Sequence, residues 1–154
     1  MNTNYFYIQN LYNGSNSITI AKINNPSSGT DLSYSLDKNS WTQCSYNSSG
    51  ICSVSLGSLN AKIYFRSSTG FSDYNGSYHI YGNKSYSIGG DIRTLIDYSN
   101  DNLSSIPEYS FDYFSRNVSN GAYSDSNNNL KSAVELDLSG FLILSVRCYR
   151  GMFQ

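Results

Sequence analysis

The first ninety residues are built of short segments in which apolar and polar side chains alternate, and this pattern limits the fold more than any other feature. Alternation along the chain predicts strands that bury one face. We expect strands at residues 4–11, 17–23, 32–36, 40–44, 51–56, 61–66 and 78–81. Turn sequences such as Asn13-Gly14 and Asn75-Gly76 separate them. Many short strands at this spacing predict a mainly β chain. A β-sandwich (immunoglobulin-like or similar) or a barrel would span residues 1–90, and we favour the sandwich.

The pattern changes after residue 90. Residues Asp91–Tyr98 predict a short helix or turn in which Asp91 is the N-cap. Its apolar face would consist of Ile92, Leu95 and Ile96. We expect a second short helix at Glu108–Phe114, a polar surface loop at Asn117–Asn129, and then a leucine-spaced segment, Leu130–Leu138. We therefore divide the chain into residues 1–90 and 91–154.

The composition favours a neutral polar surface. Only 14% of the residues are charged, against about 25% in typical proteins, and the net charge is -1. No surplus of Lys and Arg can neutralise a phosphate backbone, so we expect no nucleic-acid partner. No apolar run approaches the length of a membrane span, so we expect no direct membrane insertion. The N-terminal segment lacks the features of a signal peptide. The protein is then cytoplasmic, has lost a leader, or leaves the cell by lysis, as virion proteins do.

The three cysteines are Cys44, Cys52 and Cys148, and they form no CxxC pair, so we expect no zinc site. Residues 46–50 have the composition of a hairpin loop. A hairpin there would place Cys44 and Cys52 opposite each other on neighbouring strands. They would form either a disulfide or a pair of buried free thiols.

Several short motifs, taken in order, resemble the N-terminal domain of BspA-like leucine-rich repeat surface proteins. These are Tyr34-Ser-Leu-Asp37, Ser40-Trp-Thr42, Lys62-Ile-Tyr-Phe-Arg66 and Gly89-Gly-Asp-Ile92 followed by Leu95. The family pattern runs "EYSLDGxxWT…VYFRG…GNIxSLL". Such domains occur in surface proteins of gut Bacteroidales and in virion proteins of phages that infect them. The resemblance implies adhesion and attachment, and it implies no catalysis.

The C-terminal part is similar to the repeat of the same family. The matching residues are Phe111, Phe114, Leu130, Ala133, Leu136, Leu138, Cys148, Tyr149, Met152 and Phe153. Phe114 and Phe153 are 39 residues apart, and without the 13 residues of Asn117–Asn129 the spacing is 26, within the range of a leucine-rich repeat. The usual Cys after Phe114 is missing, and only one repeat is complete. Because a single repeat cannot bury its own faces, we expect the chain to continue past Gln154 or a partner to cover that end.

Candidates for catalysis are few. The only histidine, His79, lies in a predicted strand and no GxSxG elbow is present, so we interpret it as a structural histidine. The carboxylates are scattered through turns and helix starts. A glycan-active enzyme that uses two of them is the least favoured alternative. The acidic run at residues 97–102 lacks the central Gly and closing Glu of a calcium loop and predicts a polar turn. We expect no metal and no cofactor.

Two sets of aromatic residues are candidates for binding. Tyr74, Tyr78, Tyr81 and Tyr86 lie near Asp73, Asn75 and Asn83, a composition that suits sugar stacking and hydrogen bonding, although tyrosine is also common in ordinary strands. Tyr5, Phe6 and Tyr7 would dock onto an assembly if the terminal strand has a free edge, and otherwise form a plain edge strand. Trp41 is expected in the core.

Together these observations predict a non-enzymatic attachment protein: a phage virion decoration or fibre component whose domain leads into adhesive repeats. The alternative is a bacterial cell-surface adhesin of the same family. The partners would be other virion or surface proteins and a glycan or other host-surface ligand. A homo-oligomer would raise the affinity through multivalency.

Overall fold

The structure is a computed structural model that describes residues 3–22, 32–68, 78–100, 102–106, 117–119, 122–124, 129–139 and 143–144. It confirms that the chain is mainly β. Two main sheets hold most of the strand residues in the described part of the chain, and the single helix there is one turn long. No helix in this part of the chain has the length and hydropathy needed to cross a membrane.

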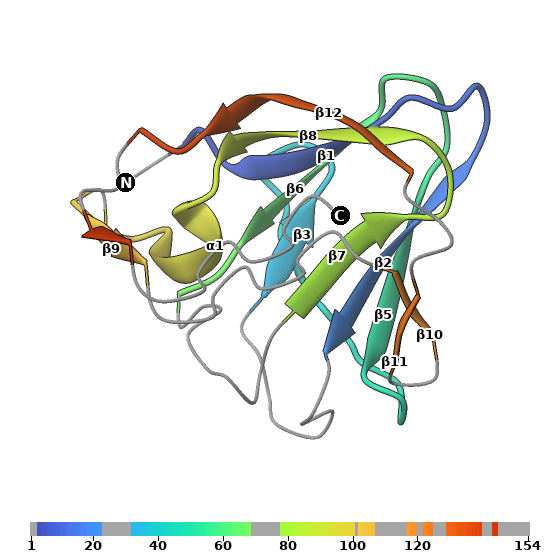
Figure 1. Ribbon diagram of the computed structural model, residues 1–154, viewed down its shortest axis with the longest axis horizontal. Helices are drawn as coiled ribbons and strands as arrows, with labels where there is room; N and C mark the ends of the chain where they lie inside the picture. The colour runs from blue at the N-terminus through green and yellow to red at the C-terminus, as the bar shows by residue number, and fades with distance from the viewer. Residues whose placement is uncertain are drawn as a thin grey trace.

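The larger sheet is mixed and has six strands (Figure 1). In spatial order they are β12 (Leu130–Asp137), β8 (Tyr86–Asp91), β1 (Phe6–Asn10), β6 (Lys62–Arg66), β3 (Ser33–Ser35) and β4 (Thr42–Gln43). β12 runs parallel to β8, and every other neighbouring pair is antiparallel. β1 therefore lies in the interior of the sheet, between β8 and β6.

The second sheet has three antiparallel strands, with β2 between the other two. They are β5 (Ile51–Leu56), β2 (Asn16–Lys22) and β7 (Tyr78–Gly82). Two small ladders complete the described part: β10 (Asn117–Ser119) is antiparallel to β11 (Ala122–Ser124), and β9 (Ser105–Ile106) is parallel to β13 (Ile143–Leu144). Helix α1 (Thr94–Asp97) follows β8 and lies beside the N-terminal end of β1.

One continuous core lies between the two sheets and α1. In the six-stranded sheet, Phe6 pairs with Phe65, and Ile8 pairs with both Ile63 and Ile88. These side chains are at most 2% exposed and join the same cluster as the isoleucines of β2 and β7. Burying each such side chain contributes roughly 1.5–3 kcal/mol, so alternation along β1, β2 and β6 supplies most of the driving force.

The strands that alternation predicted are present, and no end differs from its predicted position by more than two residues. β8 was missed, because Gly89-Gly90 suggests a break. The structure shows why glycine is needed there. Gly90 has φ +79°, and an added Cβ would lie 2.1 Å from the Tyr5 carbonyl oxygen. At Gly89 a Cβ would meet the ring of Tyr7. The two glycines allow a close approach of β1 to β8 instead of ending a strand.

The expected helix is shorter than Asp91–Tyr98, and its start was misplaced. α1 begins at Thr94, and Arg93 is the N-cap, without a side-chain cap hydrogen bond. Asp91 is the last residue of β8 and uses its carboxylate to bind Arg93. The expected apolar face is confirmed, because Ile92, Leu95 and Ile96 are all buried.

The region after residue 100 contributes directly to the larger sheet, because β12 forms its edge. Leu130, Ala133 and Leu136 pack against the core, whereas Leu138 is 39% exposed. The expected polar loop at residues 117–129 contains the β10–β11 hairpin. The expected helix at Glu108–Phe114 lies outside the described residues, as do Phe111, Phe114, Cys148, Met152 and Phe153.

Cys44 and Cys52 are buried free thiols, each 6% exposed. The hairpin expected between them is absent, since β4 is an edge strand of the larger sheet and β5 an edge strand of the smaller one. The connection between them crosses from one sheet to the other. The two thiols nevertheless meet: a hydrogen bond from Cys44 lowers the pKa of Cys52 to about 7, and the same contact raises the pKa of Cys44.

Replacing Gly90 with alanine should destabilise the fold by about 3 kcal/mol, because the added Cβ strains the backbone and overlaps the Tyr5 carbonyl. Gly57→Ala is the matched control. A Cβ at Gly57 has no neighbour within 4 Å, so its effect should stay below about 0.5 kcal/mol. Urea unfolding of both variants measures the difference. Equal midpoints for the two variants would contradict the close approach of β8 to β1.

Candidate binding site on the outer face of the six-stranded sheet

The residues of β1 that do not point into the core point to the outer face of the six-stranded sheet. Tyr7 pairs with Tyr64 on one side and with Gly89 on the other. Its ring lies 5.9 Å from the Tyr64 ring in an edge-on arrangement. Because Gly89 carries no side chain, the Tyr7 ring can extend across β8 toward β12. One strand thus supplies both the core and an aromatic outer surface.

A polar group on β12 meets the Tyr7 ring at its far end. The Tyr7 hydroxyl donates a hydrogen bond to a carboxylate oxygen of Glu135. Lys62 lies with Nζ 3.9 Å from the centre of the Tyr7 ring and 4.0 Å from the Glu135 carboxylate. The Lys62 and Glu135 side chains are 32% and 63% exposed, so solvent weakens this ion pair and it contributes little to stability. Its effect is to orient the ring and the two charges.

A second aromatic group surrounds Arg66, the last residue of β6. The guanidinium carbon lies 4.1 Å from the centre of the Trp41 ring and 4.6 Å from the centre of the Tyr98 ring. The Tyr5 ring contacts Trp41 edge-on at 4.7 Å. Trp41 is half-buried here, so its expected place in the core was wrong. It faces Tyr5 and Arg66 on the outer side of the sheet.

We refer to these residues together as the aromatic–cation face: Tyr5, Tyr7, Lys38, Trp41, Lys62, Tyr64, Arg66, Tyr98 and Glu135. Lys38 joins it because its Nζ lies 4.7 Å from the Tyr64 ring centre. Tyr5 and Tyr7 are only 7% exposed, whereas Tyr64, Trp41, Arg66 and Tyr98 are half-buried. The half-buried members are the ones that an approaching molecule can touch.

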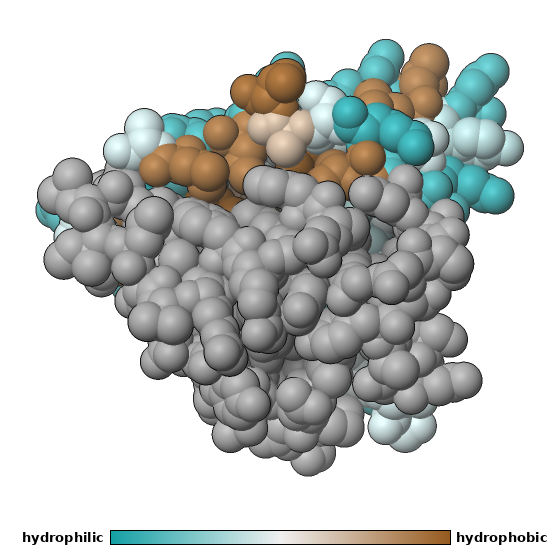
Figure 2. Space-filling view, viewed as in Figure 1, coloured by the Kyte–Doolittle hydropathy of each residue, from teal (hydrophilic) through white to brown (hydrophobic). Residues whose placement is uncertain are grey.

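A depression of about 220 Å³ adjoins this face between β1, β8 and β12. Its polar lining consists of Gln9, Ser87, Ser132 and Glu135, and its apolar lining of Leu11, Ile88 and Val134. Val134 is 90% exposed. Figure 2 shows hydrophobic side chains gathered along the upper edge of the described surface, where β12 runs in Figure 1. The depression therefore offers hydroxyl, amide and carboxylate groups beside apolar carbon.

The loop between β3 and β4 holds Lys38 and Trp41 in place. Asp37 accepts hydrogen bonds from the N–H groups of Asn39 and Ser40, each at 2.8 Å, and from the Ser35 hydroxyl at 2.9 Å. The Trp41 indole N–H donates to the Lys38 carbonyl at 3.1 Å. The Ser40 N–H, followed by the Asn39 N–H and the Ser35 hydroxyl, lowers the pKa of Asp37 from 3.8 to about 2. A carboxylate thus organises this part of the face.

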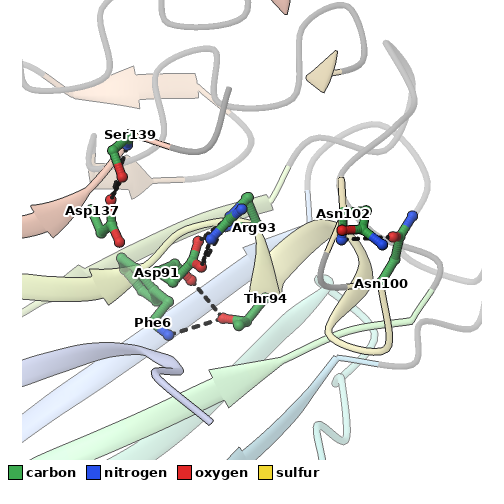
Figure 3. A network of polar contacts seen from close by, with 8 residues as sticks. All are labelled: Phe6, Asp91, Arg93, Thr94, Asn100, Asn102, Asp137 and Ser139. Atoms are coloured by element: carbon green, nitrogen blue, oxygen red, sulfur yellow. Dashed lines mark hydrogen bonds and ion pairs between the residues drawn. The ribbon is translucent and has the colours of Figure 1, made fainter. Parts of the chain in front are cut away.

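A buried polar network ties the start of β1 to α1 (Figure 3). The Phe6 N–H donates to Thr94 Oγ1 at 2.9 Å, and the Thr94 hydroxyl donates to the Asp91 carbonyl at 2.7 Å. The Asp91 carboxylate, 2% exposed, accepts bonds of 2.6–2.9 Å from the Arg93 guanidinium. Each buried donor is satisfied, which keeps the polar groups of β8 and α1 from destabilising the core. This network positions Tyr5 and, through α1, Tyr98.

Two of the four tyrosines predicted to bind sugar, Tyr81 and Tyr86, are in the core and not on this face. Tyr81 and Tyr86 are 7% and 1% exposed and belong to the core cluster, so they offer no platform for a sugar ring. Burial raises the pKa of the Tyr86 phenol. Tyr78 lies in β7 and its side chain is outside the described part, as is all of Tyr74. Tyr81 and Tyr86 are ordinary inward-facing strand residues, so their presence in the sequence needs no ligand to explain it.

The docking hypothesis for Tyr5, Phe6 and Tyr7 also needs correction. It required a free strand edge, but β1 pairs with β8 on one side and β6 on the other. Phe6 is fully buried, and its N–H is bonded to Thr94. Strand addition to β1 is therefore excluded. Tyr5 and Tyr7 are instead the buried members of the aromatic–cation face, and their rings contact those of Trp41 and Tyr64.

Sequence reasoning missed six members of this face: Lys38, Lys62, Tyr64, Arg66, Tyr98 and Glu135. A signal was present in Lys62-Ile63-Tyr64-Phe65-Arg66, where cations and an aromatic ring alternate with the core residues Ile63 and Phe65. The face of such a strand that points away from the core carries both charged and aromatic side chains. What the pattern could not show is that Trp41 and Tyr98, distant in sequence, meet Arg66.

The residues considered for catalysis and metal binding lie in an ordinary strand and in polar turns. His79 is buried in β7 opposite Ala21. Asp97 accepts hydrogen bonds from the N–H and hydroxyl of Ser99, and Asn100 accepts one from the Asn102 N–H, which is the turn geometry expected for this run. Within the described ranges, no three His, Cys, Asp or Glu side chains are grouped so that they could hold a metal ion.

We compared the chain with models of protein families, with curated proteins and with solved structures, and none of the three comparisons gives a match. The proposed function therefore depends on the chemistry of the site.

The stability of the fold should decrease as the pH falls from 5 to 2, and the ionised carboxylate of Asp37 should account for part of this decrease. Because the folded-state pKa of this carboxyl is lowered from 3.8 to about 2, its contribution is full above about pH 4 and is lost as the pH falls to about 2. Wild type should be more stable than Asp37→Asn at pH 5, and the gap should shrink toward zero near pH 2. Urea midpoints of both proteins from pH 5 to pH 2 measure this. A gap that stays constant over that range would refute the role of the ionised carboxylate.

Proposed function

We propose that this chain is a non-enzymatic attachment domain that binds a polysaccharide on its aromatic–cation face. The observation that carries the proposal is the group of half-buried rings, Trp41, Tyr64 and Tyr98, interleaved with Lys and Arg on one side of a rigid sheet. Rings of this kind supply large contact area at a low cost in conformational entropy. The adjoining depression adds hydroxyl, amide and carboxylate groups that suit sugar hydroxyls.

We further propose that the two main sheets form a β-sandwich that leads into leucine-rich repeats. The shared core of the sheets supports the sandwich. The parallel pairing of β9 with β13 supports the repeats, since Ser105 pairs with Ile143, 38 residues later, close to the spacing of 39 between Phe114 and Phe153. Stacked repeats form parallel ladders at their repeat spacing.

The loop at residues 36–40 supports the resemblance to BspA-like proteins. Lys38 has φ +66°, in the left-handed region, at the position where the family pattern has glycine. The Asp37 carboxylate and Trp41, both part of that pattern, organise the same loop. On this basis the protein belongs to a phage virion, as a decoration or fibre component, or alternatively to a bacterial cell surface. A homo-oligomer would multiply weak contacts.

Peptide mass spectrometry of purified phage particles and of washed envelopes from uninfected host cells tests the location. We expect stoichiometric recovery in the particles. Recovery only from uninfected envelopes would replace the virion with the cell-surface alternative, and recovery from neither would contradict an attachment role.

The binding surface is tested with Tyr64→Ala on an array of purified bacterial surface polysaccharides. Loss of this ring should weaken binding by roughly tenfold. Tyr12→Ala is the matched control, since Tyr12 is 42% exposed but outside the face. Equal binding by the two variants would place the site elsewhere on the molecule.

A further inference from the structure

Arg66 and Arg93 are the two arginines among the described residues, and their guanidinium groups are held by different kinds of neighbour. The Arg93 guanidinium is occupied by the Asp91 carboxylate, with donor–acceptor distances of 2.6–2.9 Å. Arg66 has aromatic neighbours instead, Trp41 at 4.1 Å and Tyr98 at 4.6 Å. Among the described residues, no carboxylate forms an ion pair or a hydrogen bond with Arg66. Its charge is therefore not neutralised by this part of the chain.

Stacking on rings orients a guanidinium without using its hydrogen-bond donors. Cation–π contact takes place through the flat face of the group, whereas its five N–H donors lie in its plane. The Trp41 ring is itself held because its indole N–H donates to the Lys38 carbonyl, and the backbone of Tyr98 is held because its N–H donates to the Ser67 carbonyl at 2.9 Å. Arg66 is thus held ready before any ligand arrives, which lowers the entropic cost of binding.

We propose that Arg66 binds the carboxylate of an acidic sugar, a uronic acid unit, within the polysaccharide bound on this face. A planar fork of N–H donors matches a carboxylate, which it binds through two parallel hydrogen bonds. Trp41 and Tyr64 flank the position and offer apolar surface for sugar C–H groups. This inference rests on the proposed function and adds the chemical class of the ligand.

The charge distribution favours an acidic polysaccharide over a nucleic acid. A phosphate backbone needs several cations along one path. On this face Lys62 already contacts Glu135, and the chain carries a net charge of -1. That leaves Arg66 and the exposed Lys38 as cations with no described acidic partner on the face, which suits widely spaced carboxylates.

Isothermal titration of the full chain with polygalacturonate tests the assignment, and the same polymer after reduction of its carboxyl groups is the neutral comparison. We expect binding to polygalacturonate and at least tenfold weaker binding to the reduced polymer. Arg66→Gln should lose tenfold or more in affinity for polygalacturonate, and Arg66→Lys should lose less, because it keeps the charge but not the fork. Lys84→Ala is the control, since Lys84 is an exposed cation over the Tyr12 ring, outside the face.

Thermal unfolding of Arg66→Gln checks that the variant folds, and Arg66→Lys keeps the test decisive if it does not. The assignment is overturned if wild type does not bind polygalacturonate, if it binds the reduced polymer equally well, or if neither Arg66 variant differs from wild type. Polysaccharide binding that needs Tyr64 but not the carboxyl groups would leave the proposed function standing and sink only this inference.

Discussion

The pairing of β1 on both of its edges is the constraint on which the rest of the structure depends. β1 contributes Phe6 and Ile8 to the core and Tyr7 to the outer face, and Tyr5, the residue before β1, joins the same outer face. Because side chains alternate along a strand, a shift of one residue in its register would exchange these two sets. Gly89 and Gly90 make the close pairing with β8 sterically feasible. Core and candidate site thus depend on one register.

The aromatic–cation face combines well-supported side chains with rings and cations that a ligand can reach. Its supporting contacts come from buried or locally bonded groups: Thr94 of α1, which accepts a hydrogen bond from the first residue of β1, and Asp37 in the loop that carries Trp41. The groups that remain accessible are the half-buried rings of Trp41, Tyr64 and Tyr98 and the cations of the face. A surface organised in this way loses little conformational entropy on binding, which suits the proposed attachment role through many weak contacts.

Much of the fold could be predicted from local pattern, and the failures have physical causes. Alternation located seven of the eight strands in the two main sheets that precede α1. β8 was missed because its glycines serve a contact with β1 that no local pattern shows. Alternation tells which residues share a face but not which face is covered, so it could not show that two of the four tyrosine candidates are buried. Tyr81 and Tyr86 are in the core, whereas Tyr64, chosen by no sequence argument, is half-exposed.

The sequence by itself determined the class of the fold and the composition of each strand face. Those properties follow from the two-residue period of a strand and from the free energy of burying apolar side chains. Only the tertiary structure decided which strands are neighbours, that β1 is interior, and that Trp41, Arg66 and Tyr98 meet. These contacts join segments far apart in the chain. Their geometry depends on the packing of both sheets and α1 at once, which no local stretch of sequence specifies.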